Sequence, residues 1–109
     1  MAMVYPVGYN QKMGYTLAST TTFRNWVEKL DPGIRCRLLA RIDRVCLGNF
    51  GDHKQLQPGL YEMRFFFGSG YRVYYTLRDG RVVLLLAGGD KSSQARDIAK
   101  AKTILDSLE

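Results

Sequence analysis

Apolar residues recur at helical spacing in two neighbouring segments of the N-terminal half of the chain. A spacing of three or four residues places side chains on one face of a helix. The first stripe consists of Phe23, Trp26, Val27 and Leu30. The second stripe consists of Ile34, Leu38, Ile42 and Val45. A short strand at 15–19 precedes the first stripe, and Thr20 or Thr21 supplies an N-cap oxygen. Asp31-Pro32-Gly33 separates the stripes and Gly48 ends the second, so the pattern predicts a strand followed by a helical hairpin.

The pattern changes to a period of two after Leu60, which predicts strands. The first strand places Met63 on one face and Arg64 on the other. Gly68-Ser69-Gly70 and Asp79-Gly80 are hairpin turns that start the next two strands. The three predicted strands cover 60–67, 71–77 and 81–87. They form an antiparallel meander.

The last predicted strand is apolar on both faces, which is typical of a central strand. The strand at 15–19 is therefore expected beside it. Ser92 or Ser93 caps a final helix whose apolar stripe ends at Leu108. We predict an α+β fold, in which the helical hairpin and the C-terminal helix pack on a small, mainly antiparallel four-stranded sheet.

The chain of 109 residues is long enough for one domain with its own core. Residues 1–13 show no periodicity and are expected to be a flexible N-terminal leader, with 14–109 as the single domain. Met13 directly precedes the first strand, so either Met1 or Met13 is the expected start of translation. No apolar run approaches a membrane span or a signal peptide, and a cytoplasmic location is expected.

The formal net charge of +6 favours a nucleic acid or an acidic protein as the partner, whereas the alternative is a solvated basic surface. Cys36 and Cys46 are expected in one helix, about 15 Å apart at 1.5 Å per residue, which is too far for a disulfide. They are expected to be structural thiols. No spacing of metal ligands is found, so we expect no metal or other cofactor.

Two arginines are the strongest candidates for chemistry. Arg64 and Arg72 lie on the more polar faces of neighbouring predicted strands, where their guanidinium groups match phosphate geometry. Tyr74 and Phe66 offer rings on which a base could stack. The alternative for Arg72 is a structural ion pair with Glu62 or with an exposed carboxylate.

Further candidates lie at the ends of the predicted elements. Lys54 is expected in a loop after the second helix, and Lys91 precedes the last helix. Each lysine either approaches the arginine-bearing face or is merely solvated. The backbone N–H groups near Ser92 and Ser93 offer an anion site at the start of the last helix. His53, the single histidine, is a candidate acid or base, unless it is just exposed.

Arginines at positions 37, 41 and 44 form a basic stripe beside the apolar face of the second helix. Arg37, Arg41 and Arg44 are expected to hold RNA phosphates or an acidic protein segment, or else to form a solvated face.

Five motifs in order resemble a known family over about residues 15–108. They are Phe23-x-x-Trp26, Gly48-Asn-Phe-Gly-Asp-x-Lys54, Tyr61-Glu-Met-Arg64, Gly70-Tyr-Arg-Val-Tyr74 and Gly88-Gly-Asp-Lys-Ser-x-Gln94. The chain is similar to the RelE/ParE toxin superfamily, most closely to its HigB-like branch of addiction module killer proteins. A RelE-like fold is what the resemblance implies.

The resemblance also implies a function, that of a type II toxin. Such a toxin is a metal-independent endoribonuclease that cleaves messenger RNA on the translating ribosome. A cognate antitoxin, often a helix-turn-helix DNA-binding protein, neutralises it. The 2′-hydroxyl of the RNA attacks the adjacent phosphate, so the protein orients the reacting groups, moves protons and stabilises charge.

By position in the motifs, Arg64 matches the arginine that the family uses on the scissile phosphate. Lys54 and Lys91 match flanking basic positions, and Arg72 matches a recurrent arginine with a partly structural role. Gly-Gly-Asp-Lys replaces the tyrosine or histidine pair of some relatives, which leaves the general acid and base open among His53, Asp90 and Lys91. The predicted catalytic residues are Lys54, Arg64, Arg72, Lys91, His53 and Asp90. The predicted RNA-binding residues are Arg37, Arg41, Arg44 and Tyr74.

Two other functions share this fold, so the fold alone does not choose among them. One is a ParE-type inhibitor that binds a topoisomerase (gyrase) without cleaving RNA. The other is a small RNA-binding or regulatory module that has lost catalysis. A basic sheet face with Lys54, Arg64 and Lys91 favours the ribonuclease.

Overall fold

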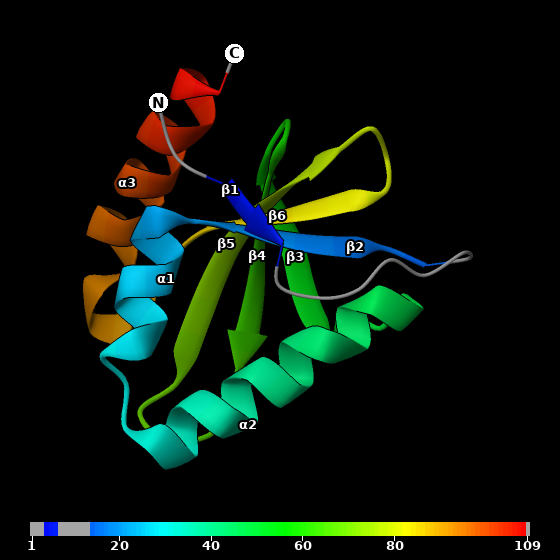
Figure 1. The fold of residues 1–109 in the computed structure, drawn as a ribbon. Coiled ribbons are helices and arrows are strands. Elements are labelled where there is room, and N and C mark those ends of the chain that lie inside the picture. Colours follow the sequence, from blue (N-terminus) through cyan, green and yellow to red (C-terminus); the bar gives the residue numbers. More distant parts are fainter. Residues whose placement is uncertain (1–3, 7–13, 109) are drawn as a thin grey trace.

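The structure is a computed structural model that describes residues 4–6 and 14–108 of the chain (Figure 1). The elements in chain order are β1 (Val4–Pro6), β2 (Thr16–Thr20), α1 (Thr21–Glu28), α2 (Pro32–Asp43), η1 (Arg44–Leu47), β3 (Asp52–Gln57), β4 (Leu60–Phe65), β5 (Tyr71–Arg78), β6 (Val82–Asp90), η2 (Lys91–Ser93) and α3 (Gln94–Ser107). In these two ranges, no helix is long and apolar enough to cross a membrane.

The strands form one sheet in the order β1-β2-β6-β5-β4-β3. Only β2 and β6 pair in parallel, and the other neighbours are antiparallel. The predicted α+β class is confirmed, and the first predicted strand does lie beside the last strand of the meander. The predicted count of four strands was wrong, because the described residues alone form a sheet of six.

The two extra strands lie at the two edges of the sheet. β3 was missed because Asp52–Gln57 contains one apolar residue, Leu56, and so shows no alternation. This strand joins β4 through the turn at Pro58-Gly59. β1 lies within the predicted leader, whose other residues (1–3 and 7–13) are outside the described residues. Edge strands need no apolar face of their own, so periodicity finds them least well.

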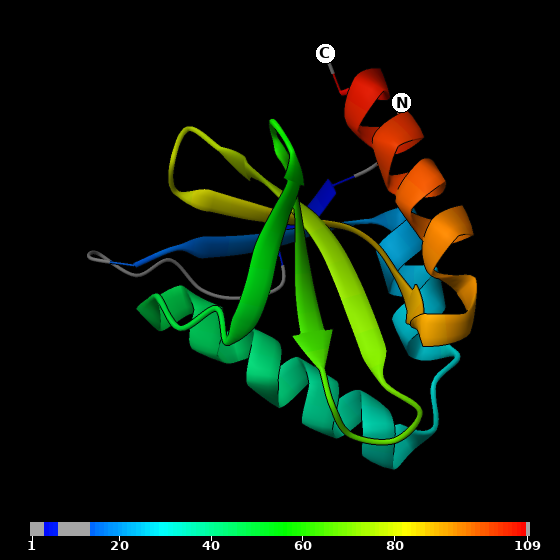
Figure 2. The same cartoon turned by 180° about the vertical axis from the view of Figure 1, so that it is seen from behind.

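Each face of the sheet carries its own apolar cluster. α1 and α2 pack on one face, here called the hairpin face, with Val73 and Leu85 at its centre. α3 packs on the opposite face, here called the α3 face, over Leu84 and Leu86. Figure 2, the view from behind, shows α3 and α2 approaching the sheet from different sides. β6 is covered on both faces, as its continuous apolar run predicts. Truncating a buried leucine of this kind to alanine typically costs about 2–5 kcal/mol.

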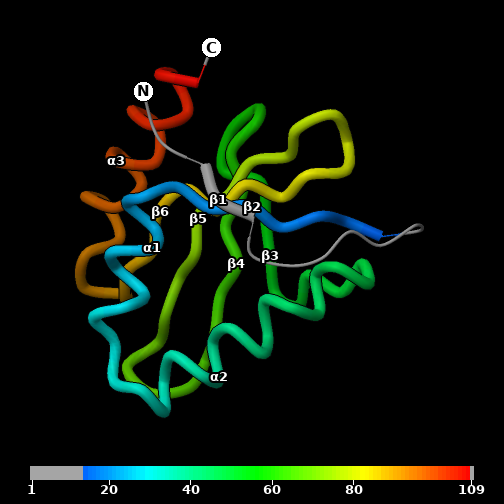
Figure 3. Tube along the Cα trace, in the orientation of Figure 1, coloured from blue at the N-terminus to red at the C-terminus, as the bar shows by residue number. Residues whose placement is uncertain are grey.

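Thr20 joins the first strand, the first helix and the central strand. Its Oγ1 accepts a hydrogen bond from the Phe23 amide at 3.1 Å, and so caps α1. The same hydroxyl donates to the Leu86 carbonyl at 2.7 Å, close to the point where the β5–β6 register shifts. Of the two predicted caps, Thr20 is the one observed. The chain path in Figure 3 shows α1 leaving the end of β2 and running alongside α3.

Two predicted boundaries were wrong. α2 ends at Asp43, so Cys46 lies in η1 and does not share a helix with Cys36. Both thiols are free, and burial raises the pKa of Cys46. β4 ends at Phe65, and the residues up to Gly70 form an irregular connection in which Phe66 is 76% exposed. A phenylalanine that apolar periodicity placed in a strand is thus presented to solvent.

Candidate nucleic-acid site on the sheet

The strand register places three of the predicted site residues on the α3 face. Lys54 lies opposite Glu62, and Arg64 lies opposite Arg72. Directly paired residues of neighbouring strands share a face. Glu62 and Arg64 are two positions apart on β4 and so share it as well.

Arg64, Arg72 and Lys91 surround one hollow of about 140 Å³ at the end of the sheet. Arg64 is the last residue but one of β4, Arg72 is the second residue of β5, and Lys91 opens η2 directly after β6. The exposed Phe66 also lines this hollow. We call it the sheet hollow. It brings two guanidinium groups and one ammonium group around a single opening, where Phe66 is the exposed one of three aromatic residues.

The two arginines both contact one buried carboxylate, that of Glu62. Glu62 is 0% exposed, and its carboxylate lies 3.9 Å from Arg64 Nε and 3.7 Å from Arg72 Nε. Gln94 Nε2 donates a hydrogen bond to it at 3.0 Å. A carboxylate with no access to water is held in place by such cationic partners. The expected alternative for Arg72, a pair with Glu62, is therefore present.

Sequence reasoning treated Glu62 only as a possible partner of Arg72, and its link to Arg64 was missed. The signal was available in the alternation, because a residue two positions before Arg64 shares its face. Asp52 adds a more exposed contact, with its Oδ2 3.4 Å from Arg64 Nε.

The arginine Nε atoms still lack hydrogen bonds. Within the described part of the chain, the Nε atoms of Arg64 and Arg72 and one oxygen of Glu62 are buried without a hydrogen-bond partner. Buried polar atoms in proteins usually have one. The buried Nε atoms of both guanidinium groups are thus held by the charge of nearby carboxylates rather than by hydrogen bonds, and 33% of the Arg64 side chain and 14% of the Arg72 side chain remain exposed.

His53 does not join this group. It lies opposite Met63, which belongs to the core of the hairpin face, so β3 directs it away from the α3 face. Its ring lies 5.6 Å from the Phe50 ring, and its Nδ1 lies 2.9 Å from the Gly51 carbonyl oxygen. His53 is exposed, as the second of its two expectations has it, and it lies on the other face from Lys54 because one step along a strand reverses the face.

Asp90 has a local structural role. Its Oδ1 accepts hydrogen bonds from the Ser92 amide at 2.9 Å and the Ser92 hydroxyl at 2.6 Å. The hydrogen bond from the Ser92 side chain is the main reason why the pKa of Asp90 is lowered. Ser93, a predicted cap, makes no capping hydrogen bond of its own. The predicted anion site at these amides is therefore filled by the protein's own carboxylate.

Two further expectations are corrected. Lys54 was placed in a loop, but it lies in the middle of β3 with an exposed side chain. Tyr74 was expected to stack on RNA, but it is 0% exposed beneath α3. Burial, followed by the nearby charge of Glu62, raises the pKa of Tyr74. A ring without exposed surface cannot stack on a base.

The arginines of the second helix lie beside the sheet end. Arg41 and Arg44 line a small second hollow of about 30 Å³ together with Arg64. The Arg37 guanidinium carbon lies 4.4 Å from the centre of the Phe67 ring, within range of a cation–π contact. The basic margin of the sheet hollow thus continues along α2. Over the described ranges, no group of three or more His, Cys, Asp and Glu residues is arranged to hold a metal ion.

The fold and this site define a small α+β protein with cations gathered at one end of its sheet. The chain belongs to the family of the phage-derived protein Gp49-like (DUF891), whose model matches residues 25–109. This is a family of RelE/HigB-like toxins, so the resemblance described for the sequence is confirmed.

Known proteins support this assignment. An uncharacterised protein of Haemophilus influenzae is 42% identical over 97 residues, which cover 88% of this chain and 98% of that protein. A mutant of the Escherichia coli toxin RelE in the free state superposes with a TM-score of 0.69 at 21% identity, over 84% of this chain and 97% of RelE. This second match shows the fold. The toxin–antitoxin complex RelBE2 of Mycobacterium tuberculosis contains a chain that matches at 27% identity and a TM-score of 0.52, over 72% of this chain and 100% of that one.

Proposed function

We propose that this chain is the toxin of a type II toxin–antitoxin module and a metal-independent endoribonuclease that cleaves messenger RNA on the translating ribosome. The family and the RelE fold support the toxin class. The observation that carries the enzymatic part is the meeting of Arg64, Arg72 and Lys91 around one open hollow.

The sheet hollow suits an RNA phosphate flanked by an unstacked base. Guanidinium forks bind phosphate oxygens through paired N–H groups. Phe66 lies at the same opening and is 76% exposed, so a base can stack on its ring. Lys54 on the same face, Arg41 on α2 and Arg44 at the start of η1 extend the positive surface along which the RNA backbone runs.

The proposed reaction follows from the family resemblance. The 2′-oxygen of the RNA attacks the adjacent phosphorus, a new P–O2′ bond forms, and the bond to the 5′-oxygen of the next nucleotide breaks. The products are a 2′,3′-cyclic phosphate and a free 5′-hydroxyl. Arg64 stabilises the negative charge that develops on the phosphorane oxygens, which is commonly the largest catalytic contribution.

Glu62 and Lys91 complete the proposed site. Glu62 does not touch RNA, and it acts as a positioning residue because its carboxylate holds both guanidinium groups. Of the three candidates for proton transfer, only Lys91 lines the hollow. Its ammonium group is suited to protonate the departing 5′-oxygen.

An antitoxin is the proposed protein partner. The RelBE2 chain that resembles this one was solved in a toxin–antitoxin complex. A formal net charge of +6 favours an acidic partner through long-range attraction.

Mapping RNA 5′ ends after induction of the protein in growing cells tests the enzymatic proposal. We expect growth arrest and cuts in phase with codons. Arg64→Ala is expected to lower the cleavage rate roughly 10²–10³-fold, as removal of one transition-state donor does. Arg78→Ala, a change at an exposed arginine near the Asp79-Gly80 turn, is the matched control and should leave cleavage intact. Growth arrest with intact transcripts and damaged DNA would overturn the ribonuclease in favour of a topoisomerase inhibitor.

A further inference from the structure

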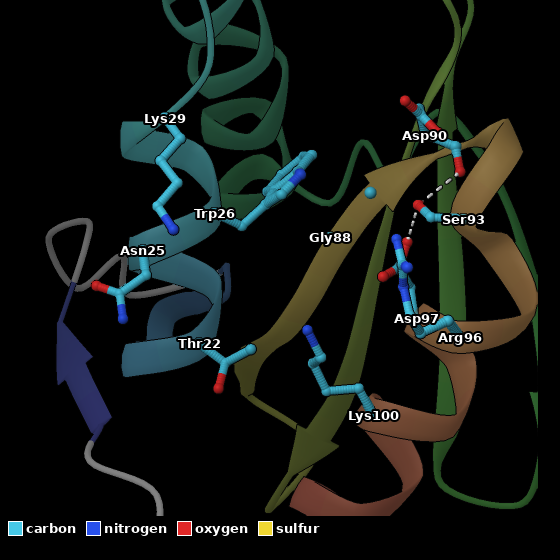
Figure 4. A pocket seen from close by; sticks show the side chains of 11 residues that line it. Thr22, Asn25, Trp26, Lys29, Gly88, Asp90, Ser93, Arg96, Asp97 and Lys100 are labelled. Carbon is cyan, nitrogen blue, oxygen red and sulfur yellow. Dashed lines mark hydrogen bonds between the residues drawn. The ribbon is translucent and has the colours of Figure 1, made fainter.

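A third, larger depression lies between α1 and α3, and Asp90 in its lining is the chain neighbour of Lys91 in the sheet hollow. It has a volume of about 730 Å³ and crosses the C-terminal end of β6 (Figure 4). Lys29 and Trp26 line it from α1, and Arg96 and Lys100 line it from α3. We call it the α1–α3 groove. Nothing in the proposed ribonuclease mechanism uses it.

Two glycines without side chains form the floor of the groove. The Trp26 ring packs so closely on Gly88 that a Cβ atom there would overlap it. On the other side of the strand, the Asp97 carboxylate and the Ser93 hydroxyl occupy the place of a Cβ at Gly89. The Gly88-Gly89 pair, too short for a phosphate-binding motif, is thus explained by close packing on both faces.

One edge of β6 is open along this floor. The pairing of β2 with β6 ends at Ser19 and Leu85, where the chain turns into α1. Beyond that point, Ala87–Asp90 pair with β5 alone among the described strands. A strand with one neighbour presents alternate backbone N–H and C=O groups on its other side. Gly88, Gly89 and Asp90 of this segment line the groove, and the two glycines form its buried floor.

The cations of the groove have no acidic partners. Within the described residues, no ion pair is formed by Lys29, Arg96 or Lys100, and all three side chains are exposed. The two carboxylates at the groove are engaged elsewhere, since Asp90 caps η2 and Asp97 accepts a hydrogen bond from Ser93. Three cations against two carboxylates still leave the lining of the groove with a positive net charge.

We propose that the α1–α3 groove binds an extended acidic segment of a protein partner, which adds as a strand to the open edge of β6. Three features meet in one place, namely a free strand edge, unpaired cations on both walls and the indole of Trp26. Peptide strands pair with such an edge through their own amides and carbonyls, while side-chain contacts select the sequence. The cations alone would also attract RNA, but the sugar–phosphate backbone does not supply the alternating donors and acceptors of a strand. The edge therefore favours a peptide.

A peptide titration tests this directly, with no need for the cellular partner. The probe is a short end-blocked peptide of alternating glutamate and valine. Trp26 is the only tryptophan of the chain, so its fluorescence reports occupancy of the groove. Lys29→Glu/Lys100→Glu is expected to weaken binding roughly tenfold or more, since each ion pair of this kind contributes up to about 1 kcal/mol and the reversed charges repel. Arg78→Glu/Lys102→Glu, with the same change in net charge at exposed positions outside the groove, should stay close to wild type.

Two further probes separate strand addition from simple charge attraction. A version of the peptide in which every amide is N-methylated keeps every charge but cannot donate a hydrogen bond to the strand edge from either side, and it should bind much more weakly. A single-stranded uridine oligonucleotide should fail to displace the unmodified peptide. Equal binding of the methylated peptide, or displacement by the oligonucleotide, would overturn the proposal.

In the cell the occupant is expected to be the antitoxin, an identification that rests on the proposed function. The groove variant Lys29→Glu/Lys100→Glu should then still arrest growth but resist neutralisation by the product of the adjacent reading frame. Full neutralisation of this variant would overturn the groove as the antitoxin site and leave the toxin assignment intact. If the wild-type protein does not arrest growth, the proposed toxin function is contradicted. The peptide titration would still show whether the groove binds an acidic segment.

Discussion

The sheet hollow and the α1–α3 groove are both positively charged, but their cations are held in different ways. In the hollow, Arg64 and Arg72 lie against the fully buried Glu62. In the groove, Lys29 and Lys100 extend from helices with no ion pair among the described residues. The two guanidinium groups of the hollow are therefore held in fixed positions, whereas the exposed lysines of the groove have the conformational freedom of unpaired side chains.

This difference matches the demands of two kinds of binding. Stabilising a transition state requires groups that are already oriented when charge develops, and a buried carboxylate provides that orientation. Docking of a flexible segment benefits from long-range attraction and adaptable contacts, which exposed lysines supply at about 0–1 kcal/mol each. The two regions meet at neighbouring residues, because Asp90 lines the groove and Lys91 lines the hollow.

The largest expected effect is a loss of stability when a cation of the hollow is removed, compared with removal of a cation of the groove. Arg72→Met leaves the Glu62 carboxylate buried with one fewer cation, and should lower the free energy of unfolding by about 3–5 kcal/mol. Lys100→Met, the matched change in the groove, should alter it by less than about 0.5 kcal/mol. Urea unfolding of both variants measures this contrast.

A second substitution sharpens the interpretation of Arg72. Glu62→Leu combined with Arg72→Met removes both charges, and should recover much of the lost stability without restoring RNA cleavage. If Arg72→Met is as mild as Lys100→Met, the hollow is not held together by its buried carboxylate.

The next effect concerns the floor of the groove. Gly88→Ala forces a methyl group against the Trp26 ring, and should lower stability by about 1–3 kcal/mol through overpacking. The shifted indole should also weaken binding of the acidic peptide, while RNA cleavage per folded molecule changes little. Fluorescence titration and a cleavage assay on the same preparation measure the two effects. Cleavage that falls in parallel with peptide binding would show that the two regions are not separable.

The elements that build these regions differ in how well the sequence predicts them. Helical spacing predicts α1 and α2, and alternation predicts β4, β5 and the buried β6, because all of them bury an apolar face. β3 buries almost nothing and leaves no such pattern. The same alternation places Arg64 and Arg72 on one face, so the arginine pair of the hollow is predictable.

Features that depend on how helices and strands pack on one another are less predictable. Tyr74 alternates with Arg72 in register, but only the position of α3 shows that it is covered. The groove depends on where β2 stops relative to β6, which is a matter of tertiary pairing. Gly88-Gly89 is visible in the sequence, yet the reason for it is the approach of Trp26 and Asp97 from different helices.

Salt should act unequally on the two regions. Between 0.1 M and 1 M ionic strength the Debye length falls from about 10 Å to about 3 Å. Binding of the acidic peptide to the exposed groove cations should therefore weaken roughly tenfold or more. The stability difference between wild type and Arg72→Met should change by less than about 1 kcal/mol, because its carboxylate is buried. Equal sensitivity to salt would contradict the distinction between fixed and mobile charges.

The smallest expected effect lies at the junction of the two regions. Asp90→Ala removes the acceptor that caps η2, and should cost about 0.5–2 kcal/mol, as the loss of a helix cap does. The pKa of Asp90 is lowered in the folded protein, so its stabilising contribution is present above its ordinary value of 3.8 and is lost as the pH falls through the folded-state value. The difference in unfolding free energy between wild type and Asp90→Ala should therefore shrink on acidification. Asp90→Asn, which keeps an acceptor without the charge, should retain most of the stability and lose this dependence on pH. If this difference in unfolding free energy instead grows towards low pH, the Asp90 carboxylate destabilises the fold. The cap of η2 would then not be what holds Lys91 between the hollow and the groove.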